Sequence, residues 1–227
     1  MEMIGKDEFL ETINRFISGR KAVYADLKEE KRLGEYFIAS FLGTLIFSAV
    51  YGLVMGIYAG GIQILYDALK IPMLLLISLF VSLPTFYVLN AILGGEMTFR
   101  QVVVLFMISV TAMSTMLVAF MPVTLFFTIT TPERGFASYT FTVMLNVLIF
   151  TLAGLTAVVY LLSGFGYIHG ENKRWIPGVL IGSCVLAFVG TQLAWVLRPY
   201  FNLSLGFIRP PSGNFYVAIL ELLLRYL

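Results

Sequence analysis

The neutral polar residues inside the long apolar segments are the groups with the clearest chemical potential in this chain. Their amides and hydroxyls can hydrogen-bond between membrane helices for about 0.6 kcal/mol each. They could instead line a passage for a small polar solute. The sequence favours hydrogen bonding between helices and keeps a polar pathway as the alternative, built from five residues: Asn90, Thr111, Ser114, Asn146 and Gln192.

Groups suited to acid–base, nucleophilic or metal chemistry are scarce. The chain has one His and one Cys, and it lacks the short motifs of phosphate-binding loops, zinc proteases and serine hydrolases. Ionisable residues inside a bilayer usually mark ion or proton pathways. Here the acidic residues between positions 60 and 200 all fall in expected connections: Asp67, Glu96, Glu133 and Glu171. We therefore expect a non-enzymatic protein with no catalytic site, no metal and no cofactor.

Composition explains this scarcity. Hydrophobic residues make up 59% of the 227 residues, charged residues make up 12%, and the mean hydropathy is +0.90. A soluble domain carries about 25% charged residues, so the sequence predicts an integral membrane protein. The net charge of +2 is too small to indicate nucleic-acid binding.

Five apolar segments are long enough to cross a bilayer, which takes about 20 helical residues. The predicted fold is an all-α polytopic bundle with an amphipathic N-terminal helix and an interfacial C-terminal helix. The bundle forms a domain at residues 34–197, with spans at residues 36–58, 71–93, 101–127, 137–162 and 176–197.

Residues 1–33 form a charged N-terminal segment in which apolar residues such as Phe9, Ile13 and Phe16 recur at helical spacing. This pattern predicts one or two amphipathic helices on the cytoplasmic membrane surface. They would either anchor the first span or act as a docking arm for a partner. Lys and Arg favour the cytoplasmic side, and ten of the fifteen lie on the N-terminal side of a five-span arrangement. The N-terminus is therefore expected inside and the C-terminus outside.

Two spans carry rows of small residues, which let helices approach closely. The first row includes Ser48, Gly52, Gly56 and Gly60, and the second, in the fifth span, is Gly178, Gly182 and Gly190. We expect the first and fifth spans to pack on each other through these rows, or one row to face another subunit.

Residues 198–227 form an external tail rich in Arg, Pro and aromatic residues, ending in a short apolar helix for which Asn214 is a credible N-cap. Arginines and aromatics are enriched where proteins bind each other. The tail therefore offers candidate partner-binding residues: Arg198, Tyr200, Phe201, Arg209, Phe215 and Tyr216.

The connection at residues 94–101, Gly-Gly-Glu-Met-Thr-Phe-Arg-Gln, resembles the corresponding connection in bacterial Yip1-domain membrane proteins. The resemblance covers roughly residues 30–197 and implies a five-helix integral membrane fold without known catalytic residues, in the bacterial cytoplasmic (inner) membrane. Eukaryotic members of that family act in membrane traffic with small GTPases. Their Asp-Leu-Tyr-Gly-Pro motif is absent here, so no functional residue is carried over.

These observations favour a structural or accessory subunit of a membrane protein complex. Its partners would be the lipid bilayer and other membrane subunits, or further copies of the same chain. The alternative is a channel or transporter component for a small solute or lipid.

Overall fold

The structure, a computed structural model, describes residues 6–93, 95, 97–131, 136–171, 173–197, 207 and 213–226. Regular structure within these residues is helical throughout, which confirms the all-α fold class. The elements in chain order are α1 (Lys6–Ser18), α2 (Arg20–Lys28), α3 (Leu33–Ile57), α4 (Gln63–Ile92), α5 (Phe99–Thr130), α6 (Phe136–His169), the 3-10 helix η1 (Lys173–Trp175), α7 (Ile176–Leu197) and α8 (Phe215–Tyr226).

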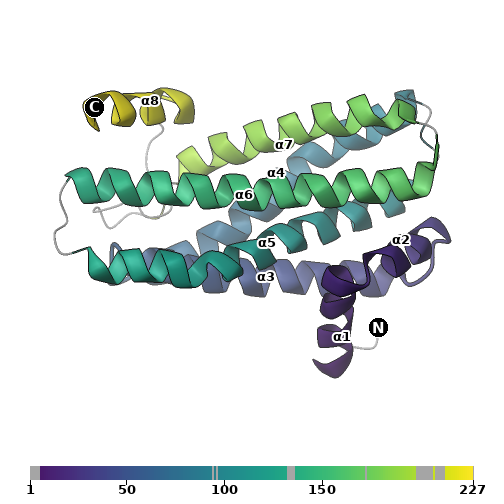
Figure 1. The fold of residues 1–227 in the computed structure, drawn as a ribbon, viewed down its shortest axis with the longest axis horizontal. Coiled ribbons are helices and arrows are strands. Elements are labelled where there is room, and N and C mark those ends of the chain that lie inside the picture. Colours follow the sequence, from purple (N-terminus) through teal and green to yellow (C-terminus); the bar gives the residue numbers. More distant parts are fainter. Residues whose placement is uncertain are drawn as a thin grey trace.

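The helices α3 to α7 are long and apolar enough to cross a membrane, as the five predicted spans require. They run side by side along the long axis of the molecule (Figure 1). At 1.5 Å per residue, the 34 residues of α6 extend about 51 Å, whereas the hydrocarbon core is about 30 Å thick. The longest helices therefore project beyond the hydrocarbon region.

The helix α4 begins at Gln63, well before the predicted start at residue 71. Asp67 and Lys70 consequently lie inside the helix, where they are 0% and 1% exposed. The expectation that Asp67 belongs to a connection is therefore wrong. The two residues are three positions apart, which places them on one face of the helix, and Asp67 Oδ1 lies 3.8 Å from Lys70 Nζ. Such pairing offsets part of the cost of burying each charge.

The central helix of the bundle is α5, which packs against both α3 and α6. Its most apolar stretch is 67% buried, the largest share among the five long helices. The helix α4 packs along α3, and α7 packs on α4. The equivalent stretch of the α7 span is only 11% buried, so α7 is the most peripheral of the five.

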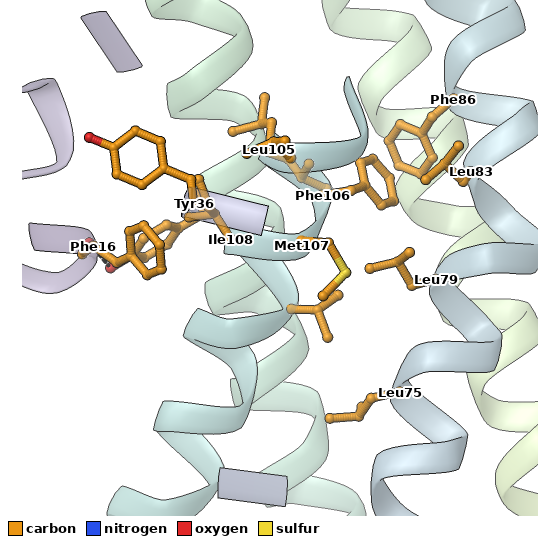
Figure 2. Packing of buried hydrophobic residues seen from close by; sticks show 14 of the residues in the cluster. Phe16, Tyr36, Leu75, Leu79, Leu83, Phe86, Leu105, Phe106, Met107 and Ile108 are labelled. Carbon is orange, nitrogen blue, oxygen red and sulfur yellow. Dashed lines mark hydrogen bonds between the residues drawn. The ribbon is translucent and has the colours of Figure 1, made fainter. Parts of the chain in front are cut away.

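Side chains of α5 fill the middle of the core (Figure 2). Phe106 of α5 meets Phe86 of α4 edge to face, with ring centroids 3.9 Å apart. Met107 is fully buried, and its side chain lies beside that of Leu79 in the same view. Dispersion contacts of this kind, each small, add up over the whole interface between α4 and α5.

The segment α1–α2 folds back onto the bundle near the start of α3, as Figure 1 shows. The Tyr24 hydroxyl donates to the backbone oxygen of Tyr160 (3.2 Å), and the Tyr160 hydroxyl donates to that of Phe16 (3.0 Å). These two bonds tie both short helices to α6. Burial raises the pKa of the Tyr24 phenol well above its usual value.

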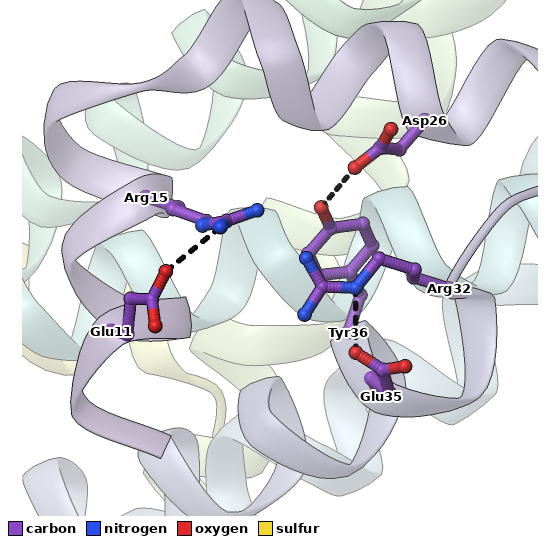
Figure 3. A network of polar contacts seen from close by, with 6 residues as sticks. All are labelled: Glu11, Arg15, Asp26, Arg32, Glu35 and Tyr36. Carbon is purple, nitrogen blue, oxygen red and sulfur yellow. Dashed lines mark hydrogen bonds and ion pairs between the residues drawn. The ribbon is translucent and has the colours of Figure 1, made fainter. Parts of the chain in front are cut away.

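Polar contacts hold the same corner together on its outer side (Figure 3). The Tyr36 hydroxyl donates to the Asp26 carboxylate, which joins α3 to α2. The Arg32 guanidinium pairs with Glu35 at 2.7 Å. The apolar faces of α1 and α2 are covered by the bundle, and their charged faces point outward.

Candidate functional site

Three of the predicted polar-pathway residues lie in two hydrogen-bonded clusters inside the bundle. In the first, the Thr111 hydroxyl of α5 lies 3.0 Å from that of Thr44 in α3 and donates to the backbone oxygen of Ser40 at 2.8 Å. Nearby, Ser114 donates to the backbone oxygen of Val110, and Ser48 donates to that of Thr44. The two bonds of Thr111 join α3 to α5, whereas those of Ser114 and Ser48 stay within their own helices. All four satisfy hydroxyls that the bilayer cannot.

The second cluster lies around Tyr51 of α3. Its hydroxyl donates to Asn146 Oδ1 of α6 at 2.7 Å and lies 3.1 Å from Thr124 Oγ1 of α5. Asn146 is 1% exposed and also donates to the backbone oxygen of Thr142. The cluster therefore links three helices. Gln192, another predicted member of the pathway, is half-buried on the peripheral helix α7.

The row of small residues in α3 packs on α4 and not on α7, contrary to the expected pairing. A Cβ atom at Gly52 would lie 2.3 Å from the backbone oxygen of Asp67, and one at Gly56 would lie 2.5 Å from Cα of Ile64. The two backbones are thus in direct contact. Gly60 follows the end of α3 and has a φ of 75°, which suits glycine, so it serves the turn and not the packing row.

The row in α7 also meets α4, at that helix's other end. A Cβ atom at Gly178 would lie 2.7 Å from the Leu93 side chain, and one at Gly182 would lie 2.7 Å from the Phe86 ring. The neighbour of Gly190 is more distant, at 3.6 Å. The first and fifth spans therefore pack on opposite ends of α4, which is their common partner.

Hydropathy alone does not predict the buried pair of Asp67 and Lys70, because it places the start of the second span after these charged residues. Lys70 Nζ lies 5.9 Å from the centroid of the Tyr66 ring and 5.4 Å from that of Phe207. The Tyr66 and Phe207 rings meet edge to face at 5.2 Å. The spacing of three residues on an apolar helix was the available sequence signal. Ionisable residues within a membrane bundle are functional candidates by default.

The connection between α4 and α5, of which the structure describes Gly95, Met97 and Thr98, caps α5 and receives α2. The Thr98 hydroxyl accepts from the Gln101 backbone N–H, and the Gln101 side chain accepts from the Thr98 N–H, which is a capping box. Gln101 Nε2 also donates to the backbone oxygen of Leu27, and the Thr98 hydroxyl donates to Glu30. The connection is therefore a docking point for the N-terminal segment.

Asn90, the remaining pathway residue, lies at the end of α4 beside this connection. Its Nδ2 donates to the backbone oxygen of Met97 at 3.3 Å, and its own backbone oxygen accepts from the Gly95 N–H at 2.8 Å. A Cβ atom at Gly95 would lie 1.9 Å from Asn90 Oδ1, so the connection needs glycine there. Asn90 is held by its neighbours and takes no part in the two clusters above.

A narrow crevice, with no room for a water molecule, lies between the ends of α4 and α6 and the start of α7. Among its lining residues, Asn90 is 4% exposed and Trp175 is 8% exposed. Within the described part of the chain, Asn90 Oδ1 and Trp175 Nε1 have no hydrogen-bond partner. The other lining residues are Phe86, Phe165, Gly178 and Val179.

Four of the six predicted partner-binding residues lie outside the described residues: Arg198, Tyr200, Phe201 and Arg209. The other two begin α8, where Phe215 is half-buried and Tyr216 is exposed. The Tyr216 hydroxyl lies 3.0 Å from Thr191 Oγ1 of α7. Asn214 Oδ1 accepts from the Val217 N–H, so Asn214 is the N-cap that the sequence predicted.

The remaining candidate groups are dispersed. In the regions that the structure describes, no three His, Cys, Asp or Glu residues lie close enough to hold a metal ion. Cys184 is exposed on α7. Comparisons with protein-family models, with curated proteins and with solved structures give no match for this chain.

Proposed function

We propose that this chain is a non-enzymatic membrane protein that serves as a structural or accessory subunit of a membrane protein complex. The observation that carries the proposal is the peripheral position of α7. Its span buries 11% of its most apolar stretch, against 67% for α5. A helix this uncovered presents a full lateral face to lipid or to another membrane protein, and small or polar residues on it allow close packing.

The interior of the bundle supports the same proposal. Thr111 and Asn146 bond to neighbouring helices, so these polar groups join helices together. This is the pattern of a packed scaffold. The α8 helix and α7 together make a second surface, since the Tyr216 ring stacks on Phe188 with centroids 6.3 Å apart.

Cysteine cross-linking in native membranes tests the proposal, because Cys184 is exposed on α7 and is the only cysteine. A maleimide–benzophenone reagent, attached at Cys184 through its maleimide and inserted into a neighbouring C–H bond by light, is expected to join the chain to one stoichiometric partner or to a second copy. The matched control moves the cysteine to the exposed Ser163 of α6 in a Cys184→Ala background. Equal yields of adducts at both positions would show random collisions and contradict a specific α7 interface.

The alternative is a channel or transporter component, which the buried pair of Asp67 and Lys70 favours. Purified chain in liposomes separates the two functions. Flux of a small solute through a monomer, abolished by Lys70→Met, would support transport and overturn the accessory role. Co-purification of a partner that is lost on deleting residues 198–227 would support the accessory role.

We further propose residence in a bacterial inner membrane with the N-terminus inside. In support, described basic residues gather at the end of the bundle that carries α2: Arg15, Arg20, Lys21, Lys28, Lys31, Arg32, Arg100, Lys173 and Arg174. Trypsin should cut α2 in inside-out vesicles and spare it in right-side-out ones. The reverse result would invert the topology.

A further inference from the structure

We propose that the end of the bundle that carries α2 (Figure 1) binds the phosphate groups of anionic lipids in the surrounding membrane. Four exposed cations make up the surface concerned, which we call the basic surface: Arg20, Lys21 and Lys28 of α2 and Arg100 of α5. The inference is separate from the α7 interface, because it concerns other helices and another class of partner.

The acidic side chains beside these cations are already engaged within the chain. Four carboxylates of α1, α2 and the connection to α3 each have a partner: Glu11 with Arg15, Asp26 with Tyr36, Glu29 with Lys31 and Glu30 with Thr98. The four cations of the basic surface, in contrast, make no ion pair with any residue that the structure describes. Their positive charge is therefore left for a partner outside the chain.

The cations of the basic surface are neighbours in space. Lys21 and Lys28 are seven residues apart, which is about two turns, so they lie on the same side of α2. The Lys28 backbone oxygen accepts from Gln101 Nε2 at 3.4 Å. Arg100 precedes Gln101 in the chain, so the start of α5 brings a further cation close to Lys28.

The depth of α2 favours lipid headgroups as the partner. The guanidinium carbon of Arg20 lies 5.0 Å from the centroid of the Tyr160 ring. Tyr160 lies about 14 Å along α6 from the last residue of that helix, His169. With α6 centred on a hydrocarbon core about 30 Å thick, about 10 Å of the helix remains at each end. Arg20 is therefore close to the hydrocarbon boundary, where the headgroups begin.

Anionic lipids match this surface better than zwitterionic ones. Each Lys or Arg near an anionic membrane surface strengthens binding about fivefold. A phosphatidylcholine phosphate is already neutralised by the choline of the same headgroup, whereas phosphatidylglycerol carries a net negative charge. A guanidinium stacked on an aromatic ring, as Arg20 is on Tyr160, can still direct N–H groups to a phosphate.

Spin-labelled lipids test the proposal on the full chain in phosphatidylcholine liposomes. The chain should immobilise a trace of spin-labelled phosphatidylglycerol more than a trace of spin-labelled phosphatidylcholine. Salt at about 1 M, where the Debye length is about 3 Å, should remove this preference. Equal immobilisation of the two lipids at low salt would overturn the lipid surface and leave the cations to an acidic partner protein.

Variants at exposed positions assign the preference to the basic surface. Lys21→Gln with Lys28→Gln should reduce it several-fold, whereas Lys21→Arg with Lys28→Arg should keep it. The matched control, Glu29→Gln with Lys31→Gln, removes an internal ion pair without changing the net charge and should leave the preference unaltered. Circular dichroism checks that each variant keeps its helices. A preference that survives Lys21→Gln with Lys28→Gln would overturn the role of these residues.

Discussion

Adding a single methyl group at Gly52 should disrupt the bundle more than adding one anywhere else along α3. The Cβ atom of Gly52→Ala would lie 2.3 Å from the backbone oxygen of Asp67 and 2.8 Å from its carbonyl carbon. Backbone atoms cannot rotate away as a side chain can. The helices α3 and α4 must therefore separate by about 1 Å to reach an ordinary van der Waals contact.

The free-energy cost follows from two opposing effects. Overpacking a filled interior costs about 1–3 kcal/mol, and the contact with backbone puts Gly52→Ala at the upper end, about 3 kcal/mol. Alanine is the better helix former by about 1 kcal/mol. The net loss of stability is about 2 kcal/mol, which lowers the melting temperature of a chain this long by roughly 4 to 8 °C.

Gly154→Ala in α6 is the matched control, because nothing lies within 4 Å of the Cβ position at Gly154. It gains the helix preference without the clash, so its melting temperature should rise by roughly 2 to 4 °C. The assay is thermal unfolding of both variants in one detergent, followed by circular dichroism. Equal melting temperatures for the two variants would refute the close backbone contact between α3 and α4.

Three further predictions concern polar contacts. Lys70→Met should destabilise the protein by on the order of 3 kcal/mol, because Asp67 loses its ion pair, and adding Asp67→Asn should restore most of that stability. Unfolding by titration with SDS measures each variant of this double-mutant cycle. A coupling energy near zero between the two positions would contradict the ion pair. Tyr51→Phe removes two contacts between helices and should cost about 1 kcal/mol in the same titration. Tyr160→Phe releases Phe16 and should speed trypsin cleavage in α1–α2 several-fold, whereas unchanged cleavage would mean that apolar packing alone holds this segment.

Hydropathy predicted the number of long helices and their approximate places, because the bilayer imposes one rule on every span. The same rule failed at the start of α4. Asp67 and Lys70 look like the end of a membrane segment when each residue is scored alone. Asp67 and Lys70 can be buried because they pair with each other and because Gly52 lets α3 approach them closely. A hydropathy value, which adds up residues one by one, contains neither effect.

Rows of small residues predicted close helix contacts, but they did not identify the partner. Gly52 and Gly182 have no side chains, so each leaves room on the surface of its own helix. Nothing in the sequence of that helix specifies which neighbouring group fills this room. On α4 the filling groups are a bare backbone at Asp67 and an aromatic ring at Phe86, which share no sequence pattern. Asn214 was predictable as a cap because its partner, the Val217 N–H, lies three residues away.

The two glycine contacts give α4 a definite mechanical role in the bundle. The α3 glycines hold α4 at its first turns by backbone contact, while Gly182 of α7 holds it near Phe86 by contact with a ring. Backbone contact leaves little freedom, whereas a ring can rotate. We therefore expect α3 and α4 to keep their relative position more firmly than α4 and α7, whose contact at Gly182 is with a side chain. A peripheral helix attached in this way can adjust to a neighbour in the membrane without disturbing the core that carries it.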